Sequence, residues 1–208
     1  MILAIDTCLT ACSVAILDGE TVLAARSEAM PRGHQERLAP LTRELMGEAG
    51  IGFPALTRIG VTVGPGSFTG LRVGIAFAKG LAAALDIPAI GVGTLEAMAF
   101  GRTGFVAAVI DARRDQVYLQ LFGDGAALTA PDALAVGTAA ARIAEVYHGG
   151  PATFVGSGAP MLEGVLAGAV IETPDGPDPV AIARLAARSA VRPVRPLYLR
   201  APDAKLPI

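Results

Sequence analysis

The order of apolar runs in the first hundred residues is the feature that most constrains the fold. Three strand-like runs come first, with the hairpin dipeptide Asp18-Gly19 between the second and the third. Helix-spaced and strand-like segments then alternate. In chain order the expected elements lie at residues 2–5, 12–17, 21–26, 34–46, 59–63, 70–85, 88–92 and 94–100, and Thr94 is expected to cap the last helix. The sequence therefore predicts the order βββαβαβα, an antiparallel meander followed by βαβ crossovers.

The second half repeats this rhythm less completely. Its expected elements are strands at 105–110, 116–122, 153–155 and 169–171, helices at 138–147 and 180–191, and an edge strand at 193–199. We predict two lobes, residues 1–101 and 102–208, with the second reduced. A meander followed by crossovers is the core of the actin, Hsp70 and sugar-kinase superfamily, so the predicted fold class is α/β with an actin-like ATPase (ASKHA) fold.

Composition indicates a globular chain, because 52% of residues are hydrophobic and 17% are charged. No stretch reaches the roughly 18 uninterrupted apolar residues of a membrane span. The most apolar region, residues 73–92, is broken by Lys79, Asp86 and Pro88. The first residues also lack the basic start of a signal peptide. We therefore expect a cytoplasmic protein without a membrane partner.

Charge and cysteine content narrow the functional classes. A net charge of −2 with 5% aromatics is unlike an autonomous nucleic-acid-binding protein. Fifteen of the 17 cations are arginines, so the alternative that folding brings several of them into a small cluster is left open. Cys8 and Cys12 are four apart with no further metal ligands nearby, which favours buried or idle thiols over a metal site.

A glycine-rich turn at Gly64–Gly70 joins a predicted strand to a predicted helix. It lacks the Gly-Lys-Ser/Thr ending of a Walker A loop. Glycines let a backbone approach its neighbour closely, and Ser67 or Thr69 can cap the helix. The sequence supports two interpretations of this segment equally: a tight structural turn, or a phosphate contact at the start of the helix. Possible phosphate contacts are Asp6, Thr7, Gly64, Gly66 and Ser67, where Asp6 ends the first strand and is equally plausible as a turn former.

The helix after this turn is apolar on almost every side. Its small-residue ridge, suited to close packing on a sheet, comprises Gly70, Gly74, Ala78 and Ala82. Its opposite stripe also carries apolar residues, so the second lobe or another protein is expected to cover it. If the leucines of the preceding helix are exposed, a helix-bundle interface is favoured. The candidate interface residues are Leu38, Leu41, Leu45, Arg72, Ile75, Ala76 and Lys79.

A dense charged turn, Asp111–Asp115, separates the first two strands of the second half. Such a turn is usually only solvated. Two neighbouring aspartates could instead serve acid–base or metal chemistry, and we keep that as the lesser alternative.

Several segments resemble the TsaB (YeaZ) family. They are Ile5-Asp6-Thr7 with Ser13-Val14-Ala15, the string from Gly64 to Gly74, Ala78-Lys79-Gly80-Leu81, Asp111-Ala112-Arg113 with Val117-Tyr118, and Pro196 to Arg200. The Gly64–Arg72 string is the most specific of these, and the resemblance spans nearly the whole chain.

The resemblance implies a non-catalytic sibling of TsaD, the catalytic member of the same superfamily. TsaD carries two metal-binding histidines in an HxxxH helix, and Thr94 and Met98 stand at those positions here. Neither is a credible ligand for iron or zinc. The chain holds only His34 and His148. A metallopeptidase is therefore the least favoured alternative.

The resemblance also implies partners. TsaB-like proteins pair with a TsaD-type catalytic subunit through the first two helices, and a TsaE-type ATPase joins the assembly, which transfers threonylcarbamoyl to N6 of adenosine 37 in tRNA. The resemblance implies no cofactor for the isolated chain, although ATP or ADP is possible in the complex. It also implies that the chain binds tRNA only as part of the complex. In the absence of TsaD, such proteins form self-dimers. The alternative is an autonomous ATPase or phosphotransferase of the sugar-kinase superfamily, with Asp6 and the glycine turn on phosphates and Asp111 near the reacting group.

Overall fold

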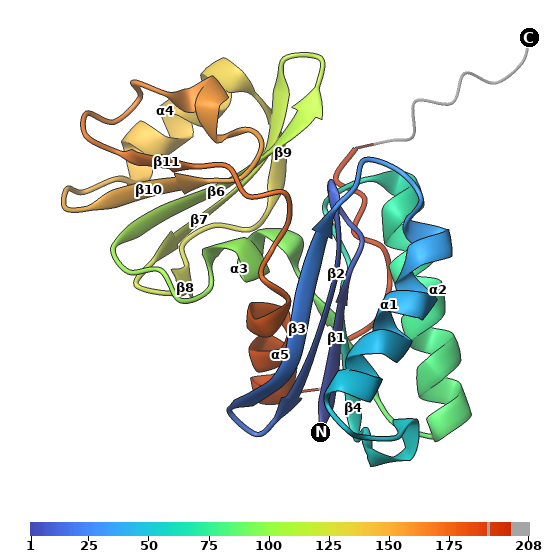
Figure 1. Cartoon of the computed structure of the whole chain (residues 1–208). Coiled ribbons are helices and arrows are strands. Elements are labelled where there is room, and N and C mark those ends of the chain that lie inside the picture. Colours follow the sequence, from blue (N-terminus) through green and yellow to red (C-terminus); the bar gives the residue numbers. More distant parts are fainter. Residues whose placement is uncertain (191, 201–208) are drawn as a thin grey trace, which may run out of the picture.

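The computed structural model describes residues 1–190 and 192–200, which form two mixed α/β lobes (Figure 1). The first lobe has the predicted order βββαβαβα. Its elements are β1 (Ile2–Asp6), β2 (Ala11–Asp18), β3 (Thr21–Ala29), α1 (His34–Glu48), the 3-10 helix η1 (Phe53–Ala55), β4 (Arg58–Thr62), α2 (Phe68–Leu85), β5 (Ala89–Val92) and α3 (Thr94–Ala99). The sheet order is β3-β2-β1-β4-β5, with β1, β4 and β5 parallel and β2 antiparallel to both of its neighbours, β1 and β3. The predicted meander and crossovers are confirmed.

Both faces of this first sheet are buried, which explains why its central strands are continuous apolar runs. In β1, Leu3 and Ile5 point into the core beneath α1 and α2, whereas Ala4 between them packs in a separate core. That second core includes Ile182 and Ala186, which lie on helix α5 (Pro179–Arg188). Alternate side chains along one strand thus serve two different helical layers.

The second lobe is a reduced version of the first. Its elements are β6 (Phe105–Arg113), β7 (Gln116–Gly123), β8 (Ala126–Ala127), β9 (Asp132–Ala135), α4 (Val136–Val146), β10 (Ala152–Val155), the 3-10 helix η2 (Ala159–Leu162) and β11 (Val170–Glu172). The sheet order is β11-β10-β6-β7-β8, and β9 also pairs with β7. In the first lobe the 18-residue α2 connects β4 to the edge strand β5, whereas in the second lobe the four-residue η2 connects β10 to the edge strand β11.

Helix α5 does not stay with the second lobe, although it falls within the predicted 102–208 unit. It packs across β1, β2 and β4 of the first sheet, on the face opposite α1 and α2 (Figure 1). The approach is close, because a Cβ added at Gly60 would lie 2.7 Å from Cβ of Ala186. An amphipathic pattern identifies a buried helix face but not the sheet that covers it, so the sequence could not place α5.

Three local predictions differ from the structure. Residues 193–199 form no strand, although Leu197 N–H donates to the Val63 carbonyl at 2.7 Å. Thr94 does not cap α3, because Gly93 holds the N-cap position and no side chain bonds to it. The last helix ends at Arg188, earlier than predicted, and Val191 lies outside the described residues.

The ridge predicted on α2 is confirmed. Gly70, Gly74, Ala78 and Ala82 are all buried on the side that faces the first sheet. Among the helices of the described part of the chain, α2 is the one long and apolar enough to cross a membrane by length and composition. Its ridge packs on β4 and β1, so it serves here as a core helix of the first lobe.

Candidate functional site

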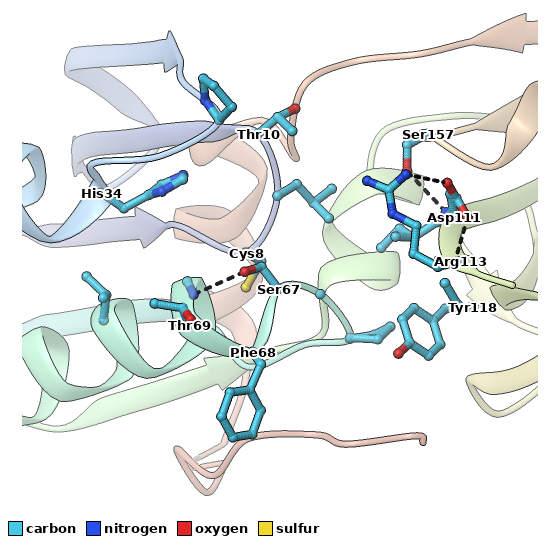
Figure 2. A pocket seen from close by; sticks show the side chains of 18 of the residues that line it. Cys8, Thr10, His34, Ser67, Phe68, Thr69, Asp111, Arg113, Tyr118 and Ser157 are labelled. Carbon is cyan, nitrogen blue, oxygen red and sulfur yellow. Dashed lines mark hydrogen bonds and ion pairs between the residues drawn. The ribbon is translucent and has the colours of Figure 1, made fainter. Parts of the chain in front are cut away.

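A cleft of about 900 Å3 lies between the two lobes. Seven segments meet there: the turn after β1, the start of α1, the glycine turn with the start of α2, the tip of the β6–β7 hairpin, Ser157 after β10, Pro174 and Asp175 after β11, and the last residues described. The lining includes Cys8–Thr10, Arg32–Gln35, Pro65–Gly70, Ile110–Arg113 and Leu197–Arg200. Figure 2 shows the first-lobe residues facing Asp111, Arg113 and Tyr118 across this space.

The glycine turn owes its glycines to close packing within the chain. A Cβ at Gly66 would lie 2.5 Å from the Cys8 carbonyl oxygen, and one at Gly64 would lie 2.8 Å from that of Leu197. A Cβ at Gly70 would overlap the carbonyl oxygen of Thr7. Ser67 caps α2 as predicted, since its Oγ accepts the Gly70 N–H at 3.3 Å. The tight structural turn, one of the two interpretations left open, accounts for these glycines, and the phosphate contact stays a prediction.

The five possible phosphate contacts differ in whether they line the cleft. Gly66 and Ser67 line the cleft, whereas Asp6, Thr7 and Gly64 are buried outside it. Thr7 Oγ1 is occupied, because it donates to the Gly70 carbonyl at 2.7 Å. The strand end and the glycine turn thus bond to each other.

Asp6 is a fully buried carboxyl. Its Oδ1 accepts the Thr62 hydroxyl at 2.5 Å and the Cys8 N–H at 3.2 Å, while Oδ2 has no hydrogen-bond partner among the described residues. Burial raises the pKa of Asp6 above its usual value, and the bonds from Thr62 and Cys8 oppose that rise. Burial therefore makes proton binding more favourable for this carboxyl than for one in solvent, and its contacts are those of a structural group.

Asp6→Asn is expected to stabilise the chain increasingly as pH rises. Because the folded-state pKa is raised, the folded protein binds the proton more tightly than the unfolded one, so the Asp6 contribution to stability is lost as pH rises through that folded-state pKa. Asparagine keeps the acceptor and removes this dependence. Melting both proteins between about pH 4 and about pH 8 should show a difference in Tm that grows with pH. A pH-independent difference would contradict the assigned burial effect.

The tip of the β6–β7 hairpin, residues 111–115, points toward the cleft. Asp111 Oδ1 accepts the Arg113 N–H at 2.7 Å, and Asp111 N–H donates to Ser157 Oγ at 3.1 Å (Figure 2). Arg113, Arg114 and Asp115 have φ angles of 64°, 55° and 57°. Three consecutive non-glycine residues in the left-handed region are strained. Asp111 lines the cleft as a turn-forming group, with Arg113 as its ion-pair partner at 3.4 Å.

The structure corrects the predicted interface residues. Leu38, Leu41 and Leu45 of α1 are buried in the core against the first sheet, and Ile75 of α2 is 6% exposed. The chain's own strands cover these side chains, so they are unavailable to another protein. The predicted leucine edge was the buried face of an amphipathic helix.

Part of the predicted interface is nevertheless at the surface. Arg72, Ala76 and Lys79 are exposed on α2, together with Gly80 and Ala83. We call these five residues the α2 outer face. It lies beside α1, because α1 and α2 run next to each other on one side of the first sheet (Figure 1).

The tail, residues 192–200, ties the two lobes together. Arg192 pairs with Glu96 at 2.7 Å, and the Tyr198 hydroxyl accepts from Arg72 Nε at 3.3 Å. Arg200 then reaches the second lobe and donates to the Ala112 carbonyl at 2.7 Å. The sequence predicted an edge strand over residues 193–199 and a family motif over 196–200, but no link between the lobes. Isolated hydrogen bonds of this kind have no periodic signature.

The remaining candidates lie apart. Thr94 and Met98 are buried on α3, and Cys8 and Cys12 are buried with thiol pKa values raised by burial, that of Cys12 to about 12. His34 lines the cleft, whereas the other histidine is exposed after α4. In residues 1–190 and 192–200 no group of three or more His, Cys, Asp or Glu side chains is placed to hold a metal ion.

Comparisons with known proteins agree on one relationship. The family model TsaD, tRNA N6-adenosine threonylcarbamoyltransferase, matches residues 26–155. The tRNA threonylcarbamoyladenosine biosynthesis protein TsaB of Escherichia coli is 43% identical over 122 residues, 56% of this chain and 52% of that protein. The chain thus spans about half the length of the curated TsaB relatives it matches.

Two further matches run nearly end to end. An uncharacterized protein of Mycobacterium tuberculosis is 38% identical over 209 residues, 98% of this chain and 93% of that protein. The structure of YeaZ from Pseudomonas aeruginosa superposes with a TM-score of 0.81 at 30% identity, over 95% of this chain and 99% of that chain. More distant structures with TM-scores of 0.53 and 0.56 share the two-lobe fold, and the predicted actin-like class is confirmed.

Proposed function

The chain belongs to the TsaB (YeaZ) family of TsaD-like proteins, and on this premise we propose that it is a non-catalytic partner subunit in the threonylcarbamoylation of tRNA. It pairs in the cytoplasm with a TsaD-type catalytic subunit, which transfers threonylcarbamoyl to N6 of an adenosine in tRNA. A TsaE-type ATPase joins this assembly, and ATP or ADP binds there rather than to the isolated chain.

The α2 outer face is the observation that carries the pairing. Ala76, Gly80 and Ala83 are small residues exposed along one helix, and small side chains let a second helix approach closely. Arg72 and Lys79 supply polar groups at the edge of the same surface. An apolar centre with charged margins is the usual anatomy of a protein–protein interface. In the absence of the TsaD-type partner, the same face supports a self-dimer.

The burial of Asp6 also disfavours the autonomous phosphotransferase. That function would need Asp6 near a phosphate, whereas its carboxyl is enclosed and bonded to Thr62 and Cys8. A non-catalytic partner subunit does not need the Asp6 carboxyl to contact a phosphate.

Reconstitution tests the proposal. Mixing the chain with a TsaD-type protein is expected to give a complex whose mass, measured by light scattering, equals the sum of the two proteins. With a TsaE-type protein, ATP, the threonylcarbamoyl donor and tRNA, modification is expected only when the chain is present. Two separate masses, together with equal modification without the chain, would contradict the proposal.

A further inference from the structure

Two exposed aromatic rings lie together at the edge of the interlobe cleft. The chain's seven Phe and three Tyr all lie within the described residues, and among them only Phe68 and Tyr198 are exposed, at 45% and 46%. Their ring centroids are 5.4 Å apart, and the Arg72 guanidinium lies 3.7 Å from the centroid of the Phe68 ring. Both residues line the cleft. Exposed aromatic side chains that cluster at one place indicate a binding surface, whereas single scattered ones need no such explanation.

Positive charge gathers at the same cleft. Arg32 stands before α1, Arg113 on the hairpin tip and Arg200 in the tail, so three separate segments each supply a guanidinium. The facing carboxylates are Asp111, held by Arg113, and Asp175, which accepts from the Thr10 hydroxyl at 3.3 Å. In a chain of net charge −2, this is the arginine cluster that only folding could assemble.

At the hairpin tip, an arginine occupies a backbone position at which other residues would be less strained. Arg113 has a left-handed backbone, yet its side chain is 85% exposed and its ion pair with Asp111 is solvated. Asparagine or glycine would adopt this conformation more readily. The backbone therefore does not favour arginine at this position, and its exposed side chain places a positive charge at the edge of the cleft.

We propose that Phe68, Arg72 and Tyr198, together with Arg32 and Arg113, form a contact surface for an unpaired segment of RNA. Bases stack on the exposed rings, and the arginines hold the phosphates of the same strand. The proposal deepens the proposed function and rests on it for the source of the RNA, which is the substrate of the assembly.

The geometry favours a strand over a free nucleotide. A free nucleotide is held in an enclosed pocket that buries most of its surface, whereas these rings stand nearly half exposed. The cations come from both lobes and the tail, so they suit a ligand with several phosphates in sequence. A paired duplex offers no free base face for Tyr198.

Fluorescence anisotropy with a labelled RNA hairpin that carries an unpaired loop tests this directly. Tyr198→Ala and Arg113→Asn are each expected to weaken binding on the order of tenfold, and Arg113→Asn to lower the slope of log affinity against log salt by about 1. Tyr198→Phe keeps the ring and is expected to bind nearly as the unaltered protein does. Arg142→Gln is the matched control, because Arg142 lies on α4, away from the cleft lining, and pairs with Glu145.

A stability measurement separates this role from a structural one. Arg113→Asn is expected to melt at or above the temperature of the unaltered protein, because asparagine tolerates the left-handed backbone. Weaker binding without lost stability supports the RNA contact. Variants that bind like the unaltered protein, equal affinity for a fully paired duplex, or displacement of the hairpin by ATP would each overturn it. Loss of the TsaD-type complex alone would overturn the proposed function and leave the RNA contact standing.

Discussion

Gly70→Ala is expected to lower the free energy of unfolding by about 3 kcal/mol. The added methyl would overlap the carbonyl oxygen of Thr7, and that oxygen belongs to the backbone at the end of β1. The two segments are also bonded, because Thr7 Oγ1 donates to the Gly70 carbonyl at 2.7 Å. Neither can move without breaking the contact between the glycine turn and the first sheet. Thermal melting should show a Tm lower by roughly 6–12 °C.

Gly80→Ala on the same helix is the matched control. Gly80 is exposed, and among the described residues no heavy atom beyond its chain neighbours and the backbone of its own helix lies within 4 Å of the position that its Cβ would occupy. Alanine is the better helix former, so a gain of about 0.5–1 kcal/mol is expected. If both variants melted alike, close packing would not be the reason for the glycines of this turn.

Two adjacent substitutions on α2 are expected to have opposite consequences. Ile75→Glu places a carboxylate in the core, and the chain is expected to lose about 3–5 kcal/mol of stability or fail to fold. Ala76→Glu puts the same group on the α2 outer face and is expected to leave folding unchanged within about 0.5 kcal/mol. It should nevertheless weaken association with the TsaD-type subunit on the order of 100-fold, because the interface would bury an unpaired charge.

Circular dichroism and calorimetric titration distinguish the two effects. Ala144→Glu serves as the control, because Ala144 is exposed on α4 in the other lobe and receives the same charge. It is expected to fold and associate normally. Equal loss of association in Ala144→Glu and Ala76→Glu would mean that added charge, rather than its position, is responsible.

Much of the fold could be predicted from local signals. Apolar runs gave the strands, and the small residues from Gly70 to Ala82 gave the packed ridge of α2. Ser67 was recognisable as a cap because a serine precedes a helical pattern. These features depend on neighbours in the sequence or on helical periodicity, which a single chain displays.

The rest depended on tertiary neighbours. Periodicity showed that Leu41 and Ile75 share faces with other apolar residues, but not that the chain's own sheet covers them. The packing of α5 on the first sheet joins segments that are more than a hundred residues apart in the sequence, and so does the hydrogen bond from Arg72 to Tyr198. The same holds for the cleft, where each arginine comes from a different segment and is unremarkable in its local sequence.

Calorimetric titration of the TsaD-type subunit with the unaltered chain and with Ala76→Glu is the most direct measurement of whether α2 presents a surface for another protein. We expect saturable binding by the unaltered chain and by Ala144→Glu, and little or none by a folded Ala76→Glu. Undiminished binding by folded Ala76→Glu would show that the catalytic subunit does not dock on this helix.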